Sequence, residues 1–209
     1  MAANESSISA PFQLVAGHVA LDLVNTLDDR FGPAGLHELL ATYDDLLRFL
    51  VESELLSDRQ ARKLKRLEAS SSERAQILEE VKTLREALAV VAYAQLNRKE
   101  IPESGLETLE VFFKQAADQR RLTCEEGNLT WGWKGLSRQI AAPLWLLAQA
   151  AADLLVSEQA LHLRACSSDT CRWLFLDTSK NHTRRWCDMK VCGNRMKARK
   201  FQARQVARA

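Results

Sequence analysis

The segment 166–208, CSSDTCRWLFLDTSKNHTRRWCDMKVCGNRMKARKFQARQVAR, decides how the rest of this 209-residue chain is interpreted. It holds two cysteine pairs, Cys166/Cys171 and Cys187/Cys192, each with four residues between its members. Two such thiolate pairs can close a tetrahedral shell around one zinc ion. The spacing is wider than the common C-x2-C knuckle, so two disulfides, or four unrelated buried cysteines, are alternatives. The clustering of four of the five cysteines, in a chain with no secretion signal near its first residue, favours metal binding in the cytoplasm.

The expected cofactor is one structural Zn²⁺, because a shell of four thiolates leaves no open position for water or substrate. A finger of about 45 residues buries little apolar surface, so metal binding is expected to supply much of its folding energy. His162 and His182 lie near the cysteines in the sequence and would serve in a mixed site. Cys124 stands apart from the cluster, and we expect it to be a small buried hydrophobe.

Several motifs resemble a known family. LFLDTS at 174–179, RRWC at 184–187 and CGNR at 192–195, followed by Lys197, resemble the CGNR zinc finger. GHVALDLVNT at 17–26 and TLREAL at 83–88 resemble the helical ABATE domain, which precedes this finger in stress-induced transcription regulators. The resemblance implies transcriptional regulation and a set of four zinc ligands, Cys166, Cys171, Cys187 and Cys192.

The expected fold is mainly α with a small β-hairpin, in which a helical domain (1–160) packs on a treble-clef-like finger (161–209). Apolar spacings of three and four predict six helices, at 17–27, from 42 to about 55, and at 57–67, 70–97, 102–116 and 137–157. Alternation around Gly127-Asn128 predicts a hairpin over 122–133. Further expected elements are disorder over 1–12, a loop over 30–36, short strands at 161–164 and 172–176, and a helix after Cys192.

Three serines are predicted to open helices, because each precedes a Gln or Glu by three residues in the manner of a capping box. They are Ser57, Ser70 and Ser104. After the third, Leu106 is expected to join the buried stripe of its helix.

Charge is divided unevenly along the chain, although its net charge is only +2. Residues 164–209 hold twelve basic and three acidic residues, whereas the remainder holds seventeen basic and twenty-four acidic ones. The finger therefore carries +9 and the remainder −7. A polyanion partner would explain this division, as would contact between the two modules.

The terminal helix concentrates the positive charge. Lys197, Lys200, Arg204 and Arg208 repeat at i, i+3, i+7 and i+11, and Arg195 and Arg199 form a neighbouring stripe. Such a helix could lie along or within a major groove, although a solvated basic face has the same pattern. The residues expected to contact nucleic acid are Arg184, Arg185, Arg195, Lys197, Arg199, Lys200 and Arg204.

Some of these residues have structural alternatives. Arg184 and Arg185 beside Trp186 are typical of a nucleic-acid patch, but Trp173 and Trp186 would equally fill the core of the finger. Arg195 could bind phosphate or pair with Asp177. Gly193 is expected to permit a positive φ or a close backbone approach.

In the helical domain, Asp22, Asn25 and Thr26 share one face at i, i+3 and i+4. They would either line a small-molecule pocket or hold neighbouring elements in place.

The sequence predicts a zinc-containing cytoplasmic transcription regulator that binds DNA through its terminal helix, with a small-molecule inducer or a homodimer as further partners. RNA is an alternative target. The rival prediction is a protein-interaction or small-ligand-binding module in which the finger only closes the helical domain. An enzyme is not expected, because the chain has no H-E-x-x-H, P-loop or dinucleotide glycine motif. Membrane insertion is not expected either, since the longest apolar tract, 141–156, is short and interrupted.

Overall fold

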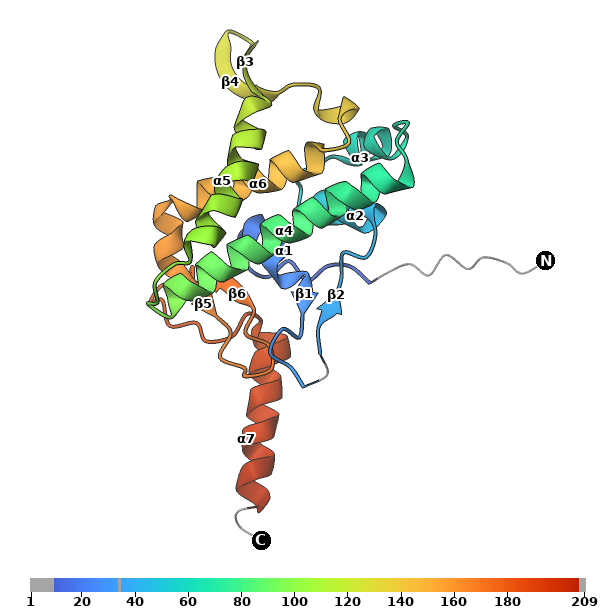
Figure 1. Cartoon of the computed structure of the whole chain (residues 1–209). Helices are drawn as coiled ribbons and strands as arrows, with labels where there is room; N and C mark the ends of the chain where they lie inside the picture. The colour runs from blue at the N-terminus through green and yellow to red at the C-terminus, as the bar shows by residue number, and fades with distance from the viewer. Residues whose placement is uncertain (1–9, 34, 207–209) are drawn as a thin grey trace, which may run out of the picture.

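Alanine- and leucine-rich segments form a body of six helices, with a hairpin at one end and the finger at the other (Figure 1). The structure is a computed structural model and describes residues 10–33 and 35–206. Within these ranges, five side chains in helices and strands are not described, those of Glu125, Lys200, Ala203, Arg204 and Val206. The body helices are α1 (Val19–Asn25), α2 (Tyr43–Glu52), α3 (Asp58–Lys65), α4 (Ser71–Leu96), α5 (Glu103–Asp118) and α6 (Ala142–Leu155). Among the described helices, none combines the length and apolar character needed to cross a membrane.

The helix α6 lies at the centre of the body and contacts α1, α2, α4 and α5. Its Leu144, Leu147 and Ala151 are almost completely buried, which confirms the expectation that this apolar segment is central. It begins later than expected, because Gln139 is extended and separates it from a short 3₁₀ turn, η1 (Leu136–Arg138).

Helix starts follow the predicted caps in two of three cases. The hydroxyls of Ser57 and Ser70 accept hydrogen bonds from the backbone three residues later, completing capping boxes with Gln60 and Glu73. The prediction for Ser104 is wrong. Pro102 occupies the N-cap of α5, where a missing N–H group costs nothing, and no side chain caps that helix. Leu106 is exposed rather than buried.

The strands form three separate antiparallel pairs. A short ribbon of β1 (Leu27–Asp28) and β2 (His37–Glu38) flanks the loop expected at 30–36. The finger contains β5 (Leu163–Ala165) and β6 (Leu174–Leu176); where a strand was expected from 161, the 3₁₀ turn η2 (Glu158–His162) extends to His162.

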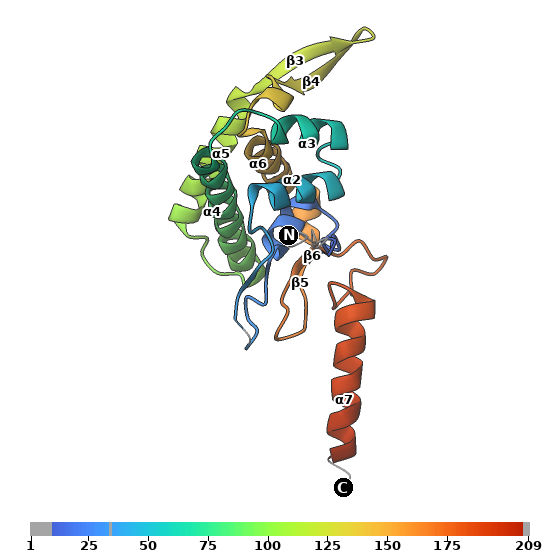
Figure 2. The same ribbon diagram turned by 90° about the vertical axis from the view of Figure 1, so that its right-hand side faces the viewer.

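The predicted hairpin is present as β3 (Arg120–Glu125) and β4 (Asn128–Trp133). Its turn is Glu126-Gly127, one residue earlier than expected, because both residues adopt the positive φ of a tight two-residue turn. The hairpin projects from the body (Figure 2), and its Leu122, Leu129 and Trp131 are exposed. Cys124 is therefore exposed, and the prediction that it is buried is wrong.

The N-terminal segment was expected to be disordered through residue 12, and its last residues are not. Residues 1–9, part of the stretch expected to be disordered, lie outside the described residues. Phe12 is ordered: its ring meets Phe49 edge-to-face at 5.2 Å, and its N–H group donates to Glu52 at 2.7 Å. The prediction of disorder through residue 12 is thus wrong at its end.

The finger packs on the body as expected. The four clustered cysteines, together with Phe175 and Leu174, belong to one continuous buried core with residues of α1 and α4. A π-helical turn, η3 (Met189–Gly193), contains the last cysteine, Cys192, and leads into the predicted terminal helix, α7 (Asn194–Val206). This helix leaves the body and points away from it (Figures 1 and 2).

Candidate metal centre and basic helix

Two tight turns position the four cysteines. Cys166 follows β5, and Cys171 lies in a turn closed by hydrogen bonds from its own N–H and that of Arg172 to the Ser168 carbonyl. Cys187 and Cys192 flank Asp188, whose carboxylate accepts from the N–H groups of Lys190 and Val191. The β5–β6 pair holds the first turn, and η3 holds the second.

The sulfur atoms are arranged as a tetrahedral metal requires. All four lie within 4.8 Å of one another, and the Sγ atoms are 3.6 Å apart for Cys171 and Cys187 and 3.7 Å apart for Cys187 and Cys192. Zinc–sulfur bonds of about 2.3 Å in a tetrahedron place sulfurs about 3.8 Å apart, whereas a disulfide needs about 2.05 Å. The cluster fits one structural zinc ion, and the disulfide alternative does not describe it.

Buried thiols at this distance need a cation to ionise together. Hydrogen bonding to Cys166 and burial raise the pKa of the Cys171 thiol, and burial and the nearby charge of Cys166 raise the pKa of Cys192. Hydrogen bonding from the Cys171 and Cys187 thiols, with a smaller contribution from the backbone of Cys187 and Ser168, lowers the pKa of Cys166. A divalent ion would supply the opposing charge for all four thiolates and cross-link the two turns.

The two histidines lie elsewhere than the mixed-site alternative requires. The rings of His162 and His182 stack on each other, with centroids 4.1 Å apart and planes 4° apart. Nδ1 of His182 also lies 2.8 Å from the carbonyl oxygen of Asp177. The histidines pack the finger beside the cluster, and the described metal-binding cluster consists of cysteines alone.

Asn25 joins the helical domain to the finger. Its side-chain amide donates to the Leu174 carbonyl and accepts from the Leu174 N–H, both at 2.9 Å, as a neighbouring strand would. Leu176 donates from its backbone to Ala16, and Trp173 Nε1 donates to Asp28 at 2.7 Å. The strand β6 is therefore held on both sides, and sequence reasoning missed the role of Asp28.

The three residues proposed to line a pocket all have protein partners. Asp22 is 7% exposed and accepts from the Ala16 N–H, and Asn25, 4% exposed, bonds to both backbone groups of Leu174. Thr26, 2% exposed, donates to Leu23 and accepts from Arg85. Burial raises the pKa of Asp22 to about 6. This geometry agrees with the structural alternative, in which the three residues hold neighbouring elements.

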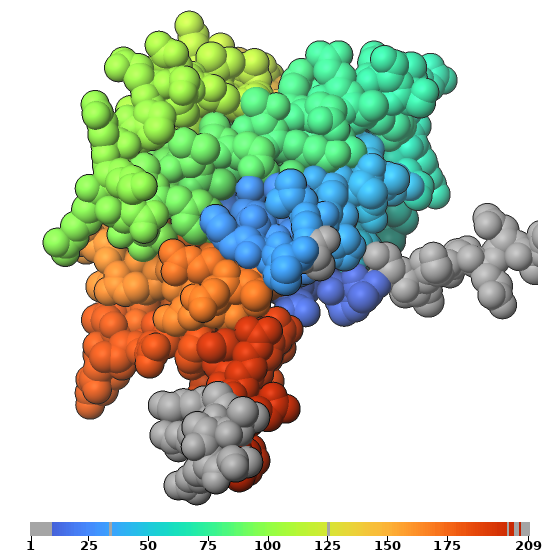
Figure 3. Space-filling view, turned by 60° about the horizontal axis from the view of Figure 1, so that its bottom comes forward, coloured from blue at the N-terminus to red at the C-terminus, as the bar shows by residue number. Residues whose placement is uncertain are grey.

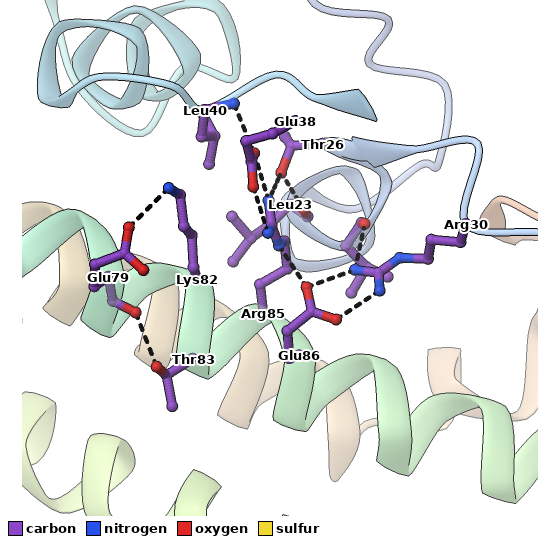
Figure 4. Close-up of polar contacts among 11 residues, drawn as sticks. Leu23, Thr26, Arg30, Glu38, Leu40, Glu79, Lys82, Thr83, Arg85 and Glu86 are labelled. Carbon is purple, nitrogen blue, oxygen red and sulfur yellow. Dashed lines mark hydrogen bonds and ion pairs between the residues drawn. The ribbon is translucent and has the colours of Figure 1, made fainter. Parts of the chain in front are cut away.

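A ladder of alternating charges connects α4 to the β1–β2 ribbon (Figure 4). Arg85, 3% exposed, donates two hydrogen bonds to Glu38 and one to Glu86, and Glu86 also binds Arg30. Burial alone would raise the pKa of Glu38, but the hydrogen bonds from Arg85 outweigh it and hold that pKa below its usual value. Sequence reasoning missed this ladder; its signal was an arginine among the apolar positions of α4.

Asp177 and Arg184 act within the finger. Asp177 is buried and accepts from the backbone and hydroxyl of Ser179 and from the Arg184 N–H. The Arg184 guanidinium lies 4.4 Å from the Phe175 ring centroid and donates to the carbonyls of Val15, Trp186 and Cys187. Asp177 is thus not the partner of Arg195, and Arg184 is committed to internal contacts rather than free for phosphate.

The tryptophans follow the core alternative. Trp173 is buried, and Trp186 is partly buried against the same core, with Arg185 over its outer face at 5.3 Å. Gly193 adopts no positive φ; a side chain there would collide with Met189 and press on Trp186, so a close approach is what this glycine permits. Asn194 opens α7 and donates to the Lys190 carbonyl at 3.0 Å.

The described basic side chains of α7 point into solvent. Arg195, Lys197 and Arg199 of this helix are all exposed, as are Arg185 and Lys190 in the finger. The ion pairs found among the described residues all lie within residues 30–86 and involve no side chain of the finger. Figures 1 and 2 show this helix standing clear of the body. Of the remaining predicted contacts, the side chains of Lys200 and Arg204 and all of Arg208 lie outside the described parts.

Two family models match the chain in this order. The model described as "ABATE: Putative stress-induced transcription regulator" matches residues 17–158, and the model described as "CGNR zinc finger" matches residues 162–205. The curated proteins contain no match to the chain.

Proposed function

The chain belongs to the ABATE family, and from that premise we propose that it is a transcription regulator that binds DNA through the basic surface of α7. The observation that carries the proposal is the solvent-facing position of Arg195, Lys197 and Arg199 on a helix that projects from the body. The rival prediction, in which the finger only closes the helical domain, requires α7 to pack against acidic residues. Arg195 lines a shared hollow with Asp28 and Asp29, but the described residues hold no hydrogen bond or ion pair between a side chain of α7 and an acidic residue.

The zinc ion has a structural role in this proposal. By cross-linking the turns at Cys171 and Cys187 it fixes the direction in which α7 leaves the finger, and its closed shell gives it no catalytic part. The proposed phosphate contacts are Arg185, Arg195, Lys197, Arg199, Lys200 and Arg204. The clustered thiols, which bind metal only when reduced, support a cytoplasmic location, and RNA is the alternative polyanion.

The test is fluorescence anisotropy of the zinc-loaded protein with a duplex DNA over a salt series. A Lys197→Glu/Arg199→Glu/Lys200→Glu variant is compared with Arg59→Glu/Arg62→Glu/Lys63→Glu, which makes the same change in charge on the exposed face of α3. Loss of three phosphate contacts is expected to make the slope of log K against log salt shallower by about 3, whereas the α3 variant should leave it near wild type.

Equal slopes for the two variants would contradict a role for α7, as would the absence of binding at low salt. Competition with a single-stranded RNA and a duplex RNA of equal length decides which polyanion is preferred. Stronger binding to either RNA than to the DNA duplex would overturn the choice of DNA.

One observation favours a second function, self-association. The exposed face of the hairpin carries Leu122, Leu129 and Trp131, which are 59%, 73% and 62% exposed. We propose that this face packs on the same face of a second copy. Sedimentation velocity should show a dimer for the wild type and a monomer for Leu129→Lys; a wild-type monomer at high concentration would contradict the proposal.

A further inference from the structure

A groove of about 580 Å³ lies where the β1–β2 ribbon, α4 and the first cysteine turn meet. We call it the seam groove and define it by six of its lining residues, Leu27, Phe31, Leu36, Val90, Tyr93 and Arg172. Figure 3 shows the three segments meeting on the face nearest α7, the ribbon in blue, α4 in green and the finger in orange. The groove thus touches the helical domain and the finger at once.

We propose that the seam groove binds a small amphipathic anion, with a flat apolar body and one carboxylate- or sulfonate-like group. Its volume falls in the range of small-molecule sites, about 300–1,000 Å³. This proposal is independent of DNA binding, because it concerns a different surface and can be tested without DNA.

The wall of the groove is apolar and open to solvent. Phe31, Leu36 and Val90 are 52%, 67% and 45% exposed, although large apolar side chains grouped around one hollow are costly to leave in water. The Phe31 ring meets Tyr93 edge-to-face, with centroids 5.5 Å apart. A flat apolar ligand would cover these side chains and pack against two rings that are already ordered.

The rim of the groove is suited to a negative charge. Arg30 and Glu86 form an ion pair at 2.6 Å, so their charges cancel. The other charged residues of the lining are the cations Lys99 and Arg172 and one carboxylate, Glu100, which leaves an excess of one positive charge. The backbone of Arg172 is fixed, because the Tyr93 hydroxyl donates to its carbonyl at 2.9 Å. No hydrogen bond or ion pair engages the Arg172 guanidinium within the described part of the chain.

The start of α5 adds to this positive rim. Pro102 lines the groove and is the N-cap of this sixteen-residue helix, and no side chain accepts a hydrogen bond from its first turn. The positive end of the helix dipole therefore lies at the groove without a side-chain acceptor. Arg172, Lys99 and this helix end together provide the complement for one anionic group.

This location differs from the pocket that was one of two alternatives for the polar residues of α1. Asp22, Asn25 and Thr26 are buried and bonded to protein groups, so a ligand would have to displace those bonds to reach them. The seam groove requires no such displacement, because its apolar side chains already face solvent.

The test uses two probes with nearly the same apolar body, 1-anilinonaphthalene-8-sulfonate and the neutral N-phenyl-1-naphthylamine. Fluorescence titrations are run on the zinc-loaded full chain and three variants. Val90→Glu places a charge in the wall, Arg172→Gln removes the rim cation, and Val111→Glu makes the matched change at a position that is 54% exposed on α5 and outside the groove lining.

The sulfonate should bind with one-to-one stoichiometry. Val90→Glu should weaken it at least tenfold and Val111→Glu less than twofold. Arg172→Gln should weaken the sulfonate several-fold while leaving the neutral probe unchanged. Equal behaviour of the Val90 and Val111 variants would place the binding elsewhere, for example on the hairpin, and would overturn the proposal. So would failure of the wild type to bind the sulfonate, or an equal loss of both probes in Arg172→Gln.

Discussion

The helical body and the finger are held together by different means. Most of the buried apolar side chains among the described residues belong to the body, and the finger contributes a short run of them, Trp173 to Leu176, together with Leu163. The body therefore folds around its own apolar core, as a chain of this length can. The apolar strand β6 of the finger packs into that same core and is bonded to the Asn25 side chain, whereas the two turns beyond it meet at four buried cysteines. In these turns a metal ion would supply the cross-link that apolar burial supplies in the body.

The two modules also differ in how they use charge. The body neutralises its buried charges in the ladder of Glu38, Arg85, Glu86 and Arg30. The finger leaves its cations exposed on α7, and most of its buried polar contacts are with backbone groups. Single substitutions in each module test this difference. They are given below in order of decreasing expected effect on metal binding or on the free energy of unfolding.

The largest effect is expected from the metal centre. Cys187→Ser should abolish stoichiometric zinc and unfold the finger while the body stays helical, because structural zinc contributes about 10–16 kcal/mol in small fingers. Metal analysis and circular dichroism measure the two outcomes. Cys124→Ser is the matched control, since that thiol is exposed on the hairpin and should leave both unchanged. Full zinc occupancy in Cys187→Ser would refute the four-cysteine centre.

The next largest effect is expected from the ladder. Arg85→Met leaves the Glu38 carboxylate without its main partner beneath α4, and should lower the free energy of unfolding by about 3–5 kcal/mol. Urea denaturation measures this loss. Lys82→Met, one turn earlier on α4, removes the pair with the exposed Glu79 and only a weaker charge interaction with Glu38, and should cost less than about 1 kcal/mol. Similar costs for the two variants would mean that the ladder does not stabilise the body.

A smaller effect is expected at the junction of the modules. Asn25→Ala leaves the N–H and carbonyl groups of Leu174 buried without partners and should cost about 2–4 kcal/mol. Asn97→Ala, which removes a solvent-exposed bond to the Tyr93 carbonyl, is the control and should cost well under that amount. If Asn25→Ala unfolds at the wild-type urea concentration, the amide does not anchor β6.

The smallest effect depends on pH. The folded pKa of Asp22, about 6, lies above its usual 3.8, so its contribution to stability is complete below pH 3.8 and is lost as pH rises through 6. Asp22→Asn should therefore gain about 2–2.5 kcal/mol over the wild type between pH 4 and 7. Urea midpoints at pH 4, 5.5 and 7 measure the difference. A difference that is constant across these three values would contradict the burial of an ionisable Asp22.

Local signals predicted the finger better than they predicted the body. The zinc cluster and α7 depend on residues close in sequence, so cysteine spacing and the i, i+3 basic stripe were sufficient. The bonds of Asn25 join residues 149 apart, and Arg85 reaches Glu38 across 47 residues. A local sequence pattern cannot predict that residues so far apart in the chain are in contact. For this reason the polar face of α1 was compatible both with a ligand pocket and with contacts that hold neighbouring elements.

The same reason explains the errors at the hairpin. Alternation predicted its strands correctly, but alternation only implies that one face is apolar, not that anything covers it. In the fold the hairpin extends beyond the helices, so Cys124, Leu129 and Trp131 remain in solvent.

The contrast between the two modules is tested most directly by hydrogen–deuterium exchange of the full chain with zinc and after chelation. Removing the metal should abolish amide protection in β5, β6 and α7, while α4 and α6 keep theirs. Loss of protection throughout the chain would show that one cooperative core depends on zinc. Unchanged protection in β5 and β6 would show that the finger folds without the metal, and would contradict the substitution of zinc for an apolar core.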